Sequence, residues 1–105
     1  MTPGRTSLIA IALFWLVSGP ARAETIRVTI DKLVFTPAEV TAKLGDTIEW
    51  VNKDVLAHTA TATSGDFNIV LAPKQNGRTV LTKAGLTDYF CKYHPNMKGR
   101  VTVTP

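Results

Sequence analysis

This 105-residue sequence has too few cysteines for an internal disulfide and no apolar run long enough for a membrane-spanning helix. It holds one cysteine, Cys91, so no disulfide can close within the chain. Its longest apolar run, Leu8 to Val17, has ten residues, fewer than the roughly 20 that a transmembrane helix requires. The chain therefore depends on a packed core, or on a bound ligand, for its stability.

Concentrated charge is lacking as well. Twelve Lys and Arg residues against eight Asp and Glu give a formal charge of +4, and no long basic run occurs. A charge of this size affects solubility and the steering of partners, but it does not indicate nucleic-acid binding. After position 23 no stretch has convincing helical periodicity, which argues against a helical bundle.

The first 23 residues have the pattern of a secretory signal peptide. Arg5 and the amino terminus supply positive charge, the apolar run follows, and Ala21-Arg22-Ala23 matches a small-x-small cleavage motif. We expect cleavage there, export to a periplasmic compartment, and one domain over residues 24–105 with no membrane association. Loss of Arg5 and Arg22 would leave ten basic and eight acidic residues, a formal charge of +2.

Alternation of apolar and polar residues predicts β-strands throughout this domain. Residues 25–30 place Ile26, Val28 and Ile30 on one face, the period of a half-buried strand. After an apolar stretch at 33–35, further strands are predicted at 39–44, 47–52, 58–62, 78–82, 86–91 and 99–104, with 67–71 as an edge strand or irregular and 72–77 as a loop. Short strands between turn signals indicate an all-β Greek-key β-sandwich of about seven to eight strands, with Trp50 as a core anchor.

Three possible metal donors lie within seven residues at the end of strand 86–91: Cys91, His94 and Met97, spaced C-x-x-H-x-x-M. Thiolate and thioether favour Cu(I), whereas imidazole also accepts Cu(II), so the set suits copper best. Two histidines and one cysteine with a weak axial methionine are typical of blue-copper electron-transfer sites. His58, the only other histidine, would supply the second imidazole, because the loops of a sandwich gather at its two ends.

The same residues also allow roles that do not involve copper. Cys91 alone could be a buried inert thiol or form an intermolecular disulfide. Zinc also binds one cysteine and two histidines, although Met97 would then have no role. A Cys/His hydrolase needs both groups in a substrate cleft, which so short a loop cannot build. A binuclear copper centre is excluded because it requires a second cysteine.

The mature domain resembles the cupredoxins, and its Cys-Lys-Tyr-His-Pro-Asn-Met loop is most similar to the amicyanin and plastocyanin branch. The similarity also covers 45–52, His58-Thr59, 85–91 and 97–101. It implies that His58, Cys91 and His94 are the strong copper ligands and that Met97 is the axial one. It also implies that Asn52 ties the two ligand loops together by hydrogen bonds, as outer partners of metal ligands do.

The resemblance and the donor set together predict a monomeric, exported type 1 copper protein that carries single electrons through one Cu(I)/Cu(II) ion and is not an enzyme. Its partners would be redox proteins, an electron donor and an acceptor. Lys92, Lys98 and Arg100 could form a basic rim for an acidic partner, or simply a solvated face. A periplasmic copper carrier or storage protein could use the same ligands, and copper affinity and release rates would separate the two functions.

Overall fold

The computed structural model describes residues 22–105, so all but the last two residues of the predicted signal peptide lie outside the described part. Nine strands are present there: β1 (Thr25–Asp31), β2 (Val34–Thr36), β3 (Glu39–Lys43), β4 (Thr47–Asn52), β5 (His58–Ala62), β6 (Asn68–Leu71), β7 (Asn76–Val80), β8 (Gly85–Phe90) and β9 (Lys98–Thr104). No helix within these residues could cross a bilayer. The prediction of an all-β fold is confirmed, with nine strands in place of seven or eight.

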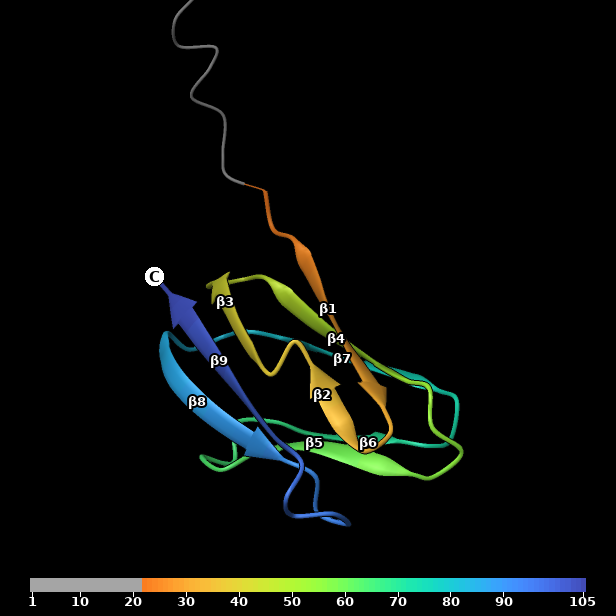
Figure 1. The fold of residues 1–105 in the computed structure, drawn as a ribbon. Helices are drawn as coiled ribbons and strands as arrows, with labels where there is room; N and C mark the ends of the chain where they lie inside the picture. Colours follow the sequence, from red (N-terminus) through yellow and green to blue (C-terminus); the bar gives the residue numbers. More distant parts are fainter. Residues whose placement is uncertain (1–21) are drawn as a thin grey trace, which may run out of the picture.

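The strands form two sheets that face each other as a sandwich (Figure 1). One sheet has the order β2-β1-β4-β7, and the other has the order β3-β9-β8-β5-β6. The pairs β1–β4 and β3–β9 are parallel, while the remaining pairs are antiparallel. Of the segment 67–71, predicted as an edge strand or irregular, residues 68–71 form strand β6 at the edge of the five-stranded sheet.

The core between the sheets is built on aromatic rings. Trp50 of β4 and Tyr89 of β8 are both buried, with their ring centroids 5.4 Å apart in an edge-on contact. Phe35 and Phe67 pack against Tyr89 and complete the cluster. Burial raises the pKa of Tyr89 to about 12, because the ionised phenol would lose its hydration. Trp50 thus anchors the core, as its place in an alternating strand predicted.

The predicted boundary between loop 72–77 and strand 78–82 is wrong by two residues, because β7 begins at Asn76 and ends at Val80. Gly77 lies opposite Trp50 in the β4–β7 register, inside the sheet. A β-carbon at Gly77 would come within 2.5 Å of the Ile69 side chain and 2.9 Å of Leu71. The glycine is therefore needed for close packing of β6 on β7, and its occurrence did not mark a turn.

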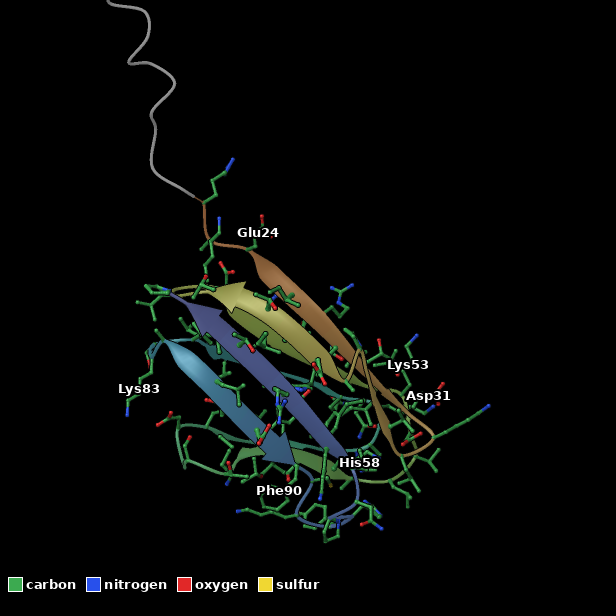
Figure 2. All side chains as sticks on the ribbon, turned by 60° about the vertical axis from the view of Figure 1, so that its left-hand side comes forward. Glu24, Asp31, Lys53, His58, Lys83 and Phe90 are labelled. Carbon is green, nitrogen blue, oxygen red and sulfur yellow. The ribbon has the colours of Figure 1, made fainter. Side chains whose placement is uncertain are left out.

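The loop before β5 and the loop after β8 lie at one end of the sandwich. Figure 2 shows His58 and Phe90 near this end and Glu24 near the opposite end. His58 begins β5 and Cys91 directly follows β8, and these two antiparallel strands are neighbours in one sheet. Residues that are 33 positions apart in the sequence therefore come into contact at this end.

Candidate metal centre

His58, Cys91 and His94 bring one donor atom each to a single point. The Cys91 sulfur lies 3.7 Å from Nδ1 of His58 and 3.7 Å from Nδ1 of His94. All three donor atoms lie within 4.8 Å of one another. The two imidazole rings meet at 61° with centroids 5.0 Å apart, so both can point their Nδ1 atoms at one ion.

These separations fit a metal at the centre of the three donors. With a metal–sulfur bond of about 2.3 Å and a metal–nitrogen bond of about 2.0 Å, as in comparable zinc sites, a trigonal angle places sulfur and nitrogen about 3.7 Å apart. Both observed sulfur–nitrogen distances are 3.7 Å. The sulfur thus lies at the distance from each imidazole nitrogen that coordination requires.

Burial divides the donors into inner and outer ones. Cys91 and His58 have no exposed surface, and Met97 is 4% exposed. His94 is half-buried and lines a hollow of about 400 Å³, together with Leu33, Tyr93, Pro95, Asn96 and Met97. Water is excluded from the sulfur, and His94 is the donor that faces the surface.

The loop from Cys91 to Met97 is folded by its own backbone. The Cys91 N–H donates to the Met97 carbonyl at 3.1 Å, the His94 N–H donates to the Cys91 carbonyl at 3.3 Å, and the Met97 N–H donates to the His94 carbonyl at 2.8 Å. Pro95, which follows His94, has no N–H to leave unpaired and a restricted φ. The loop's own backbone hydrogen bonds therefore help to hold its donors in place.

Asp54 is a functional residue that the sequence analysis missed. Its carboxylate accepts a hydrogen bond from Nε2 of His58 at 2.8 Å, and from the Lys32 and Leu33 amides at 2.7 and 3.0 Å. Because Nε2 carries the proton, Nδ1 of His58 presents a lone pair to the metal position, the usual carboxylate–histidine–metal arrangement. Burial alone would raise the pKa of Asp54, but the two amides and His58 outweigh it and lower that pKa.

The same carboxylate fixes the turn between β1 and β2. Lys32 and Leu33 both have positive φ, 54° and 65°, as the two central residues of a type I′ turn do. Lys32 and Leu33 are not the Gly or Asn that such a turn prefers. The turn geometry therefore depends on the two hydrogen bonds that their backbone N–H groups donate to Asp54. Asp54 thereby links His58 to Leu33, which lines the hollow beside His94.

Thr59 connects the two ligand segments. Its N–H donates to the Cys91 sulfur at 3.3 Å, and its hydroxyl oxygen accepts the Lys92 N–H at 2.9 Å. The hydroxyl proton goes to Thr61 at 2.9 Å, because Thr61 uses its own proton to donate to Oδ1 of Asn68 at 2.7 Å. A hydrogen-bonded chain of Thr59, Thr61 and Asn68, which we call the threonine chain, thus runs from the ligand loop to the start of β6.

The role predicted for Asn52 is wrong. Its side-chain amide donates to the carbonyls of Leu56, Leu71 and Ala72, at 2.9, 3.3 and 3.1 Å, and its Oδ1 accepts the Asp54 N–H at 2.9 Å. Asn52 therefore ties the segment before His58 to the end of β6, and it makes no bond to the Cys91 loop. Thr59 makes the connection that was expected of Asn52.

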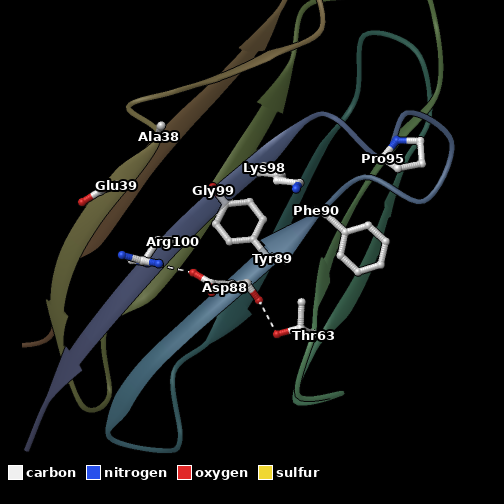
Figure 3. Close-up of a pocket in the computed structure, with 10 residues that line it drawn as sticks. All are labelled: Ala38, Glu39, Thr63, Asp88, Tyr89, Phe90, Pro95, Lys98, Gly99 and Arg100. Atoms are coloured by element: carbon white, nitrogen blue, oxygen red, sulfur yellow. Dashed lines mark hydrogen bonds and ion pairs between the residues drawn. The ribbon is translucent and has the colours of Figure 1, made fainter.

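Arg100, one of the three predicted rim cations, is paired. Its Nε lies 2.7 Å from Oδ1 of Asp88, which raises the pKa of the guanidinium. The pair lines a hollow of about 570 Å³ on β8 and β9. Figure 3 shows the pair at one end of this group of residues, with Phe90 and Pro95 near the other end. No donor of the three-residue cluster lines this hollow.

Comparisons with known proteins agree with this geometry. Amicyanin from Paracoccus versutus is 34% identical over 87 residues, which cover 77% of this chain and 66% of that protein, slightly less than two thirds. Plastocyanin from Nostoc punctiforme is 31% identical in an alignment that covers 93% of this chain and 87% of that protein. A solved Cu(I) form of an amicyanin variant superposes with a TM-score of 0.66 at 29% identity, covering 82% of this chain and 86% of that one.

A family model shows to which family the chain belongs. The model of the cupredoxin-like domain matches residues 6–103, nearly the whole chain. The two sheets, the donors gathered at one end of the sandwich and the similar proteins all lead to the same family. The chain belongs to the family of cupredoxin-like domains.

Proposed function

We propose that this protein is an electron carrier with one copper ion held by His58, Cys91 and His94, and with Met97 as a weak axial ligand. The observation that carries the proposal is that two imidazole nitrogens each lie 3.7 Å from the sulfur of Cys91, which is fully buried. Met97 is buried at the end of the same loop. Bound copper would supply a one-electron Cu(I)/Cu(II) couple.

The surrounding residues suit electron transfer. Asp54 orients His58, Thr59 donates an N–H to the sulfur of Cys91, and the ligand loop is closed by its own hydrogen bonds. Donors held in this way change little when the charge of the site changes, which lowers the reorganisation that accompanies each transfer. Hydrogen bonding around the sulfur also tunes the reduction potential.

We place the exchange of electrons at His94. It is the one ligand of the three that reaches the surface, beside the exposed apolar side chains of Leu33 and Tyr93. A redox protein can exclude water from such a face and come close to the imidazole edge. Lys92 and Lys98 are exposed nearby, so a partner with acidic groups would be steered toward it, and Arg100 contributes less because Asp88 neutralises it.

We propose no enzymatic role. A catalytic thiol has to reach a substrate, whereas the sulfur-bearing residue Cys91 has no exposed surface. We further propose that residues 1–23 direct export, that residues 24–105 are the mature monomer, and that it works in the periplasm.

The test is the addition of Cu(II) to purified mature protein. An intense thiolate-to-copper band in the visible range is expected, and it should be lost in Cys91→Ala and weakened in His58→Ala and His94→Ala. Thr63→Val, a change in the turn that follows β5 and away from the donors, is the matched control. An unchanged spectrum in a ligand variant would remove that residue from the site, and rapid release of copper to an acceptor protein would favour a carrier of copper over a carrier of electrons.

A further inference from the structure

The end of the sandwich remote from the metal centre contains a buried carboxylate with an unusual partner. Asp46 is 5% exposed, and its Oδ1 accepts a hydrogen bond from the backbone nitrogen of Glu24 at 2.9 Å. Its Oδ2 accepts the Lys43 N–H at 2.8 Å. These two amides, the Glu24 one first, lower the pKa of Asp46, although burial opposes them.

Glu24 is held at this position from its other side too. Its carbonyl accepts the Thr47 N–H at 2.9 Å, and the parallel register of β1 on β4 starts at the next residue, with Thr25 opposite Thr47. Arg22 and Ala23 are exposed and belong to no strand. The last residue of the small-x-small motif therefore lies directly before the first residue that the fold fixes.

We propose that Asp46 is the receptor for a new amino terminus, formed when the peptide bond between Ala23 and Glu24 is hydrolysed during export. Water adds across the bond: its oxygen completes the Ala23 carboxylate, and the Glu24 nitrogen becomes an amine that takes up a proton. The neutral amide 2.9 Å from Asp46 thus becomes an ammonium group in the same place.

This change converts a neutral hydrogen bond into an ion pair. Bonds between charged groups are about twice as strong as those between neutral ones, and the ammonium has three donors where the amide had one. The mature domain therefore gains a stabilising contact that the precursor lacks, and it gains this contact only if cleavage occurs at this one bond.

The ion pair requires that the chain begin at Glu24, because in a chain that begins at Ala23 the nitrogen of Glu24 is again a neutral amide. The charge of the terminus would lie one residue further out, on an exposed segment. The inference goes beyond the proposed electron transfer and does not depend on copper. It depends on the proposed cleavage, which the mass of the exported protein checks separately, with Glu24 expected as its first residue.

The test is a double-mutant cycle on copper-loaded protein. One form begins at Glu24 and the other at Ala23, each released from a fusion by a protease that leaves no added residue, and each is made with Asp46 and with Asp46→Asn. With Asp46 present, we expect the Glu24 form to have an unfolding equilibrium constant about fivefold lower than the Ala23 form. With Asn at this position the two forms should unfold alike.

The cycle separates the ion pair between the Glu24 ammonium and Asp46 from other effects of the Asp46→Asn substitution. Asn keeps one acceptor oxygen and replaces the other by an NH2 group, so one of the backbone bonds from Glu24 and Lys43 is lost. Any loss common to both forms cancels in the cycle. Equal stability of the Glu24 and Ala23 forms with Asp46 present would overturn the proposal, as would a difference that persists in Asp46→Asn. A mature protein that begins at another residue would overturn it as well, while leaving the copper site untouched.

Discussion

The threonine chain makes a sharp prediction, because Thr61 touches no metal donor and yet should affect the site. Thr61→Val has nearly the same shape but cannot accept the proton of the Thr59 hydroxyl. Thr59 is 1% exposed, so that proton would lose its partner in a place that water does not reach. At the other end Asn68 is exposed, and water can replace Thr61 there at little cost.

The magnitude follows from this asymmetry. A buried donor without a partner costs roughly 1–3 kcal/mol, while the exposed Asn68 end adds little. A loss of about 1.5 kcal/mol lowers the melting temperature of a domain of this size by roughly 6–12 °C. Thr61→Ser keeps the hydroxyl and should recover most of this loss, and Thr63→Val, whose hydroxyl bonds only to the Asp88 carbonyl, should lose much less.

A second measurement separates positioning of the site from simple stability. The Thr59 hydroxyl will seek another acceptor, which moves the N–H that lies 3.3 Å from the Cys91 sulfur. A thiolate that loses this donor keeps more negative charge, stabilises Cu(II) and lowers the reduction potential. Cyclic voltammetry and the visible band should therefore change in Thr61→Val and return to the parent values in Thr61→Ser.

Two outcomes would refute the reasoning. A lower melting temperature with an unchanged potential and band would show that the threonine chain supports the sheet and does not position the sulfur. A Thr61→Val protein that melts like the parent would show that Thr59 finds another acceptor without strain.

Three further predictions follow from other parts of the molecule. Met97→Gln should lower the reduction potential by about 59 mV, a tenfold change in equilibrium constant, because an amide oxygen favours Cu(II). Met97→Leu should raise the potential. Potentials equal to the parent's in both variants, measured by voltammetry, would make Met97 a packing residue. Electron-transfer rates with an acidic partner should fall as salt is raised from about 10 to about 200 mM, less so in Lys98→Gln, and stopped-flow rates that ignore salt would exclude steering. The Arg27 guanidinium lowers the pKa of Glu49, with help from Arg78 and against the effect of burial. Glu49→Gln should therefore destabilise the domain at neutral pH, and this effect should fade in acid as the parent's Glu49 is protonated; denaturant titrations from neutral to acidic pH check the sign.

The strands and the donor set could be predicted because both are local properties. Alternation with a period of two depends only on neighbouring residues, and it located β1, β4 and β9 to within one residue. The C-x-x-H-x-x-M spacing likewise places three donors on one short loop, and the chemistry of those donors indicates a metal. His58 was found by elimination, since no other histidine remained.

The contacts around the donors could not be predicted, because each joins segments that are distant in the sequence. Asp54 accepts hydrogen bonds from the amides of Lys32 and Leu33, more than 20 residues earlier in the chain. Neither residue is of a type that marks a turn with positive φ. Asn52 has the residue type suited to a tie between loops, but its strand aims it at the end of β6. A carboxylate four residues before a histidine was the one available signal, and it is too common to identify a partner without the fold.

The two histidines are therefore not equivalent, although both place Nδ1 at 3.7 Å from the sulfur. His58 is fully buried and its second nitrogen is hydrogen-bonded to Asp54, so its tautomer and ring orientation are set by the protein. His94 is half-buried, and the ring nitrogen away from the sulfur has no hydrogen bond to the part of the chain that the structure describes. A docked redox partner can reach this edge of His94 but not His58. The asymmetry supports the proposed division of roles, in which His58 fixes the site from within and His94 passes the electron outward.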